Sequence, residues 1–173
     1  MEERRKILNG NLEVALRLLA ILTTCKTAMT VERLSVYSYF TLYLSDYKSD
    51  EDSMHPQIPY RNSSFINSNE VVMLALEILL TKGLVESDVT KASLKFKSTE
   101  LGVALYGQID GEYKKKLVAS IEEAHRLMKG KSDRYLNNYI YSNLAKWGSE
   151  FEYESVLKLC HGDRSMASEV FQR

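Results

Sequence analysis

The sequence predicts a mostly α-helical protein with one small β-hairpin, arranged as a winged helix-turn-helix core and a C-terminal helical extension. Glycine and proline are scarce, with 8 and 2 in 173 residues, which favours long uninterrupted helices. Apolar residues recur at helical spacing over most of the chain, whereas residues 84–87 and 94–98 alternate between apolar and polar. Two helices, a third helix and then a hairpin is the order of a winged helix.

The N-terminal segment predicts two helices. The first runs from about Glu3 to Thr24, and leucines at positions 8, 12, 16 and 19 share one stripe of it. Other apolar residues widen this stripe to more than half the circumference, so we expect the helix to pack on two sides, against its own domain and against a partner. Thr30 is the expected N-cap of the second helix, which runs from Val31 to about Leu44.

A long segment without periodicity, residues 46–67, separates the second helix from the third. Loops of this length in a compact domain are uncommon and are often functional. The third helix begins at Asn67, where Glu70 completes a capping-box-like pattern, and ends at Gly83. The expected core stripe of this helix consists of Val71, Leu74, Ala75, Ile78 and Leu79. The expected solvent face consists of Val72, Met73, Leu76, Glu77 and Leu80.

The hairpin is expected between Leu84 and Ser98, and Thr99 is the expected cap of a short helix that ends near Gln108. We therefore divide the chain into a winged-helix-like domain over residues 1–108 and a helical extension over residues 109–173.

Two further helices are expected in the extension. Asp110 is the expected cap of a helix from Glu112 to Lys129, and Ser132 or Asp133 begins the next one. A last short helix is expected after Asp163.

Composition and charge exclude several classes of protein. The 45% of hydrophobic and 27% of charged residues are ordinary globular values. Lys and Arg total 23, as do Asp and Glu, so the net charge of +0 gives no general attraction to nucleic acid or anionic membranes. The two cysteines, Cys25 and Cys160, cannot build a disulfide framework or, with three scattered histidines, a recognisable zinc site. We expect no cofactor, no signal peptide and no membrane span.

No catalytic motif is recognisable, so we expect a protein that is not an enzyme. His55 with Asp46 or Asp52 could be a base and the carboxylate that orients it. A histidine beside a proline in a loop is more often a structural hydrogen-bonding group, which is the interpretation that we favour.

DNA binding by a stand-alone winged-helix transcription regulator is the alternative function, and it requires the third helix to enter the major groove. The charged residues of that helix are Glu70, Glu77 and Lys82. The carboxylates of Glu70 and Glu77 would repel the phosphates of the DNA. The hairpin offers three candidate phosphate contacts, Lys91, Lys95 and Lys97, although alternating lysines are more often a solvated face. The 11 tyrosines favour a subunit of a complex, because tyrosine is enriched at protein interfaces.

Several segments resemble the Middle Component 2 family of ABC-three-component systems. The most specific is residues 53–61, which is close to the family's S-L-H-P-x-x-P-x-R loop. Residues 8–19 resemble its LN-x-x-LE-x-x-xR-x-L helix, and residues 43–46 resemble its D-Y-L-x-x-x-S-D helix end. Weaker similarities occur at residues 79–85, 96–102 and 144–147, so the resemblance extends from Leu8 to Trp147.

The resemblance implies a small, non-catalytic subunit of a bacterial defence complex, of which Lamassu-type anti-phage and anti-plasmid systems are the best-known examples. Its partners in this hetero-oligomer would be a Rad50/SMC-like ABC ATPase and an effector, commonly a nuclease. The subunit would link the two in the cytoplasm and hold the effector inactive until the ATPase engages foreign DNA ends. Contact with DNA would be made mainly through the complex.

The matched motifs also imply residues that contact a partner or organise the loop. They are Arg17, Tyr43, Asp46, His55, Pro56, Pro59, Arg61 and Trp147. Arg61 has two interpretations, because it could contact a partner or pair with Asp46 and fix the loop.

Overall fold

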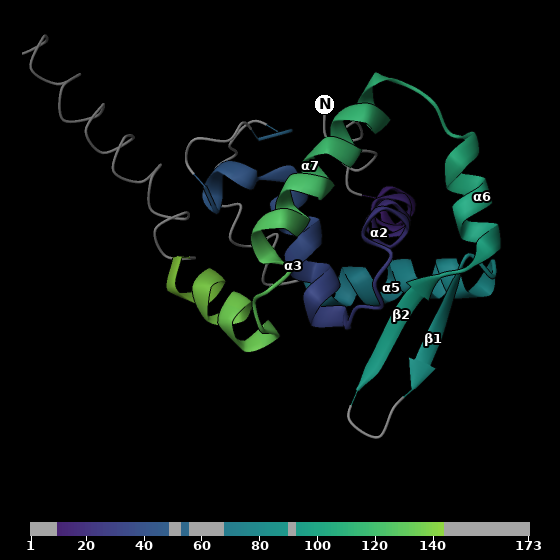
Figure 1. The fold of residues 1–173 in the computed structure, drawn as a ribbon. Coiled ribbons are helices and arrows are strands. Elements are labelled where there is room, and N and C mark those ends of the chain that lie inside the picture. The colour runs from purple at the N-terminus through teal and green to yellow at the C-terminus, as the bar shows by residue number, and fades with distance from the viewer. Residues whose placement is uncertain (1–9, 49–52, 56–67, 90–92, 144–173) are drawn as a thin grey trace, which may run out of the picture.

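The computed structural model describes residues 10–48, 53–55, 68–89 and 93–143. Its elements in chain order are α2 (Asn11–Cys25), α3 (Val31–Leu42), the 3-10 turn η1 (Leu44–Asp46), α5 (Ser68–Thr81), β1 (Val85–Val89), β2 (Leu94–Ser98), α6 (Glu100–Gln108) and α7 (Glu112–Met128). A further helix covers residues 133–143. The expectation of a mostly helical chain with a small antiparallel hairpin is confirmed (Figure 1).

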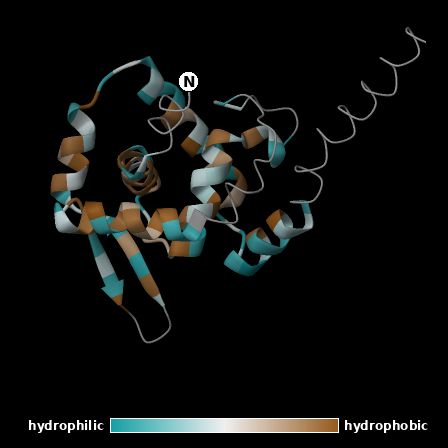
Figure 2. Ribbon diagram, turned by 180° about the vertical axis from the view of Figure 1, so that it is seen from behind, coloured by the Kyte–Doolittle hydropathy of each residue, from teal (hydrophilic) through white to brown (hydrophobic). Residues whose placement is uncertain are grey.

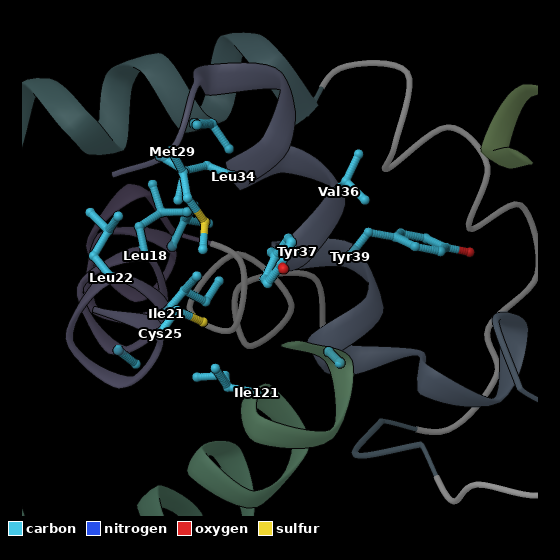
Figure 3. Close-up of a cluster of buried hydrophobic side chains, with 14 of the residues drawn as sticks. Leu18, Ile21, Leu22, Cys25, Met29, Leu34, Val36, Tyr37, Tyr39 and Ile121 are labelled. Atoms are coloured by element: carbon cyan, nitrogen blue, oxygen red, sulfur yellow. The ribbon is translucent and has the colours of Figure 1, made fainter. Parts of the chain in front are cut away.

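Helix α2 lies at the centre of the fold, seen end-on in Figure 1, and packs against α3, α5, α6 and α7. Its side chains Leu18, Ile21 and Leu22 are buried and meet Tyr37 from α3 and Ile121 from α7 (Figure 3). The expected leucine stripe is buried only in part. Leu19 lies in the core, whereas Leu12 and Leu16 are 65% and 37% exposed.

Local sequence signals set the ends of several elements as expected. Thr30 and Thr99 are the N-caps of α3 and α6, and their side chains accept hydrogen bonds from the backbone N–H groups of Arg33 and Gly102. Gly83 has a φ of +65°, the left-handed conformation that favours glycine after the end of a helix. The cap expected at Asp110 is wrong, because α7 begins after Gly111 and the Asp110 carboxylate accepts its hydrogen bond from the Gly111 N–H instead.

The hairpin pairs Val85 with Ser98 at its open end and Val89 with Leu94 next to its turn. A short bridge between Met29 and Phe96 extends this pairing to the segment that joins α2 and α3. The backbone N–H of each residue donates to the carbonyl of the other, with N–O distances of 2.9 and 2.8 Å. The hairpin is therefore fastened to the helical core through β2.

The predicted division at residue 108 stays a prediction. Helix α7, which follows it, packs against α2 and α3 and buries Leu117, Ile121 and Met128 in the same core. Ser120 of α7 also donates a 2.6 Å hydrogen bond to the backbone carbonyl of Thr41. The short helix expected after Asp163 lies outside the described residues.

Candidate functional site

Four of the residues implied by the family motifs lie in the described part of the chain, namely Arg17, Tyr43, Asp46 and His55. The other four, Pro56, Pro59, Arg61 and Trp147, lie outside the described residues, as does Lys91 of the hairpin. The pairing expected between Arg61 and Asp46 therefore stays a prediction.

Arg17 is buried in the interior, with only 5% of its surface exposed. Its guanidinium donates to Glu13 one turn earlier at 2.8 Å and to the Ser38 hydroxyl of α3 at 3.3 Å. The bond to Ser38 joins α2 to α3. In this structure Arg17 organises the fold instead of presenting its charge at the surface.

His55 fastens the long loop to two helices. Its backbone N–H donates to the Leu42 carbonyl at 3.2 Å, and its ring meets the Tyr43 ring edge to face. Its Nε2 lies 3.5 Å from the hydroxyl of Tyr113 in α7. Burial lowers the pKa of His55, and the positive charge of Arg17 lowers it further. The arrangement supports the structural interpretation of this histidine.

Asp46, the last residue of η1, contributes a second set of contacts at the start of the loop. Its Oδ2 accepts a 2.6 Å hydrogen bond from the Tyr39 hydroxyl, and its backbone carbonyl accepts one from Tyr139 at 3.2 Å. We call the contacts of His55 and Asp46 the loop junction. It connects α3, η1, the loop and the helix at 133–143.

A pocket of about 190 Å³ opens beside this junction, between the first turns of α2 and the connection from α6 to α7. Its walls are mostly apolar, with Leu16, Ile109 and Leu117 among them. Glu13, Arg17 and the α6 residue Tyr106 add polar groups to the lining. Tyr106 and Tyr113 were missed by sequence reasoning, because only the tertiary fold brings them to Arg17. The spacing of Glu13 and Arg17, one helical turn apart, is a signal that could have revealed their pair.

The surface of α5 is apolar, but its buried face differs from the expected one. Val72 and Leu76, which were expected to face solvent, are buried, whereas Leu74 is 43% exposed. Met73 and Leu80 are exposed as expected. Together with Phe96 of β2, exposed residues of α5 line a groove of about 320 Å³, in which Glu77 is the one charged residue.

Helix α6 presents a second apolar surface at the edge of the molecule (Figure 2). Leu101, Val103 and Leu105 are all exposed, and Glu100 is the one charged residue of the helix. We call the exposed apolar residues of α5 and α6 the apolar face, which consists of Met73, Leu74, Leu80, Leu101, Val103 and Leu105. Helices that expose several large apolar residues are typical of protein interfaces.

The two described lysines of the hairpin form no free basic patch. Lys97 pairs with Glu86 across the strands at 3.0 Å, and Lys95 is half-buried opposite Asp88. In the part of the chain that the structure describes, no three His, Cys, Asp or Glu side chains gather as metal ligands. Burial raises the pKa of the Cys25 thiol to about 12, so this thiol is unreactive. None of the described helices is long and apolar enough to cross a lipid bilayer.

Residues 7–150 match the family model of the ABC-three component (ABC-3C) system Middle Component 2. The match covers more than half of the chain and includes every element described above. No curated protein and no solved structure matches the chain significantly.

Proposed function

Because this chain belongs to the Middle Component 2 family of ABC-three-component systems, we propose that it is a non-catalytic bridging and regulatory subunit. In this proposal it links an SMC/Rad50-like ABC ATPase to an effector, commonly a nuclease, in the cytoplasm of a bacterium. It holds the effector inactive until the ATPase engages foreign DNA, as in an anti-phage system of the Lamassu type. Membership of a multi-component system implies protein partners.

The apolar face carries this proposal. A helix that is exposed at Leu101, Val103 and Leu105 leaves apolar surface in water, which a protein partner would cover. Apolar side chains on α5 and α6 also fit the depletion of charge at the centre of protein interfaces.

We also propose that α2, α3, α5 and the hairpin form a winged helix-turn-helix scaffold used for protein contact. The order of the elements and the bridge from Met29 to Phe96 support this assignment. In such a scaffold α5 takes the place of the DNA-reading helix. Its groove offers Glu77 as its charged residue, and the Glu86 partner of Lys97 further reduces the attraction for phosphate.

The test is co-purification of the tagged chain with the products of its neighbouring genes, followed by mass determination of the complex. Leu101→Asp should weaken assembly by about tenfold or more, because it places a charge in the apolar face. Its fold should survive, because Leu101 is 58% exposed and a carboxylate near a helix N-terminus is favourable.

Ala119→Asp is the matched control, since Ala119 is exposed on α7 and the charge change is the same. A complex that contains the ATPase, is lost with Leu101→Asp and is kept with Ala119→Asp would support the proposal. A lone chain that binds duplex DNA with a steep salt dependence would instead favour the transcription regulator.

A further inference from the structure

The hairpin has one open edge. Among the described residues β1 pairs only with β2, and β2 lies between β1 and the segment that contains Met29 (Figure 1). Every residue of β1 after Val85 is exposed. An open edge presents backbone N–H and C=O groups with which another chain can pair.

The register shows which backbone groups of β1 point outward. Phe96 makes both of its backbone hydrogen bonds with Met29, on the far side of β2. Its cross-strand partner Ser87 is therefore in a non-hydrogen-bonded pair and directs its own N–H and C=O away from β2. The 3.1 Å bond from the Thr99 N–H to the Leu84 carbonyl gives the same alternation. The residues two positions before and after Ser87 face outward in the same way.

The charges along this edge favour a basic segment. Glu86 and Asp88 of β1 alternate with the outward backbone groups. The lysines paired with them, Lys97 and Lys95, belong to β2. A strand added to β1 lies about 5 Å from it and about twice as far from β2. Such a strand therefore meets the two carboxylates first, and opposite charges on adjacent strands attract.

The other face of the hairpin is apolar. Val85 and Phe96 are buried on this face. Val89 and Leu94 continue it toward the turn, with 75% and 43% of their surface exposed. Successive side chains of an added strand point to opposite faces, so those opposite Ser87 lie on the apolar face, next to Val89.

A second copy of this chain fits the edge poorly. Antiparallel pairing of two β1 strands about Ser87 places Glu86 of one protomer opposite Asp88 of the other, and it does so twice. Like charges directly opposite each other destabilise a pair of strands. The charges therefore select a different partner.

We propose that the outer edge of β1 binds an extended segment of a partner protein as an added antiparallel strand, in which basic and apolar residues alternate. The basic side chains lie opposite Glu86 and Asp88, and the apolar ones lie opposite Ser87 and cover Val89. Backbone hydrogen bonds provide the affinity, and the alternation of side chains provides the specificity. The edge contains no residue of the apolar face, so the inference goes beyond the proposed function and does not depend on it.

The probe is a blocked heptapeptide in which lysine alternates with valine, with lysine at both ends. NMR titration of the full isotope-labelled chain should give saturable shifts of the β1 amides. At saturation the Ser87 N–H should exchange about tenfold more slowly, whereas the Asp88 N–H, which already points to β2, should be unchanged. The same peptide with glutamate in place of lysine should bind about tenfold more weakly.

Two singly N-methylated forms of the lysine peptide separate backbone pairing from charge attraction. In the antiparallel arrangement the N–H of the central valine donates to β1, and the N–H of the next lysine points to solvent. Methylation of the valine nitrogen should weaken binding about tenfold or more, and methylation of the lysine nitrogen should change it by less than about twofold. Equal effects of the two methyl groups would overturn the added strand.

Variants of β1 test the same edge from the protein side. Ser87→Pro removes an outward N–H, and proline is tolerated on an edge strand where its nitrogen faces solvent, so Tm should be unchanged while peptide binding weakens about tenfold or more. Asp88→Lys leaves the backbone intact and should weaken the lysine peptide and strengthen the glutamate peptide, each about threefold or more. Glu122→Lys is the matched control, because Glu122 is exposed on α7 and the charge change is the same.

Saturable binding with these preferences would support the inference. Absence of saturable shifts in β1, equal affinity for the two peptides, or wild-type affinity in Ser87→Pro would each overturn it. A dimer of the free chain that dissociates with Ser87→Pro would also overturn it and would assign the edge to a second copy. Leu101→Asp, which tests the apolar face, should bind the lysine peptide as the wild type does, so failure of one contact is distinguishable from failure of the other.

Discussion

Arg17 lies inside the molecule, with only 5% of its surface exposed. A buried charge is tolerated only when it is paired and hydrogen-bonded, and Glu13 and Ser38 provide this pairing. The interaction with Ser38 joins α2 to α3, so the residue connects the central helix to its neighbour. These contacts give Arg17 a structural role inside the fold.

Replacing Arg17 should therefore reduce stability. Arg17→Met keeps the aliphatic stem but leaves Glu13 without its cation, and we expect a loss of about 2–3 kcal/mol in the free energy of unfolding. Urea denaturation measures this loss. Lys115→Met is the control, because its pair with Glu112 is exposed on both sides and should contribute less than about 0.5 kcal/mol. Equal effects of the two substitutions would contradict the account of Arg17.

His55 and His125 make stability dependent on pH in the same direction. Burial is the main cause that lowers the pKa of both below 6.5, with Arg17 adding to it at His55 and Lys129 and Arg33 at His125. The unfolded chain therefore binds more protons than the folded chain as the pH falls below about 6.5. Stability should be full above this pH and decline below it.

Urea unfolding at pH 7.5 and pH 5.5 measures this decline. In the double variant His55→Gln and His125→Gln the decline should be smaller, because the two depressed pKa values are gone. Carboxylates contribute equally to both proteins, so the difference between them isolates the histidines. An unchanged decline in the double variant would show that neither histidine resists protonation in the folded state.

Among the elements, α5 shows why a helix can be predicted while its buried face cannot. Nearly every residue between Val71 and Leu80 is apolar, so hydrophobic periodicity selects no single stripe. Ala75 and Leu79 are buried as the spacing predicts, but packing against α2 also buries Val72 and Leu76, which were expected to face solvent. By contrast, the threonine caps and Gly83 were predictable because a cap depends on residues a few positions apart.

The same distinction applies to the site. Each motif residue was visible in the sequence, but the pocket was not, because Glu13, Tyr106 and Tyr113 come from three different helices. No local sequence pattern indicates that these three side chains lie close together. Their proximity follows from the packing of α6 and α7 around α2.

Substituting alanine for each of the two glycines of α6 is expected to change stability in opposite directions. A Cβ at Gly102 would lie 2.1 Å from the Leu84 backbone oxygen, whereas a Cβ at Gly107 would meet nothing within 4 Å. Gly102→Ala should therefore cost about 2–3 kcal/mol or more, since the backbone cannot move away as a side chain can. Gly107→Ala should stabilise the chain by about 0.5–1 kcal/mol, because alanine favours the helix. Thermal unfolding of both variants decides this, and a stable Gly102→Ala protein would refute the close approach of α6 to Leu84.

At the scale of the whole molecule, the helix at residues 133–143 is attached by two separate sets of contacts. At its start, Arg33 of α3 pairs with Asp133 and donates to the carbonyls of Met128 and Lys131 at 3.2 and 3.1 Å. Further along, Leu136 and Ile140 are buried in the common core. The start therefore depends mainly on one guanidinium, and the rest on apolar packing together with the hydrogen bond from Tyr139 to the Asp46 carbonyl.

Arg33→Met should loosen this helix without unfolding the molecule. Hydrogen exchange of the 133–143 amides should become about tenfold faster or more, because a charged pair and two hydrogen bonds are lost. The α2 amides should keep their protection, because α2 does not depend on these bonds and its core contacts to α3, α5 and α7 remain. Lys115→Met provides the control, since it removes an exposed cation of α7 that pairs with Glu112 of the same helix. Faster exchange in α2 as well would mean that the helix is an inseparable part of the core. Unchanged exchange would mean that the contacts of Arg33 do not hold the helix.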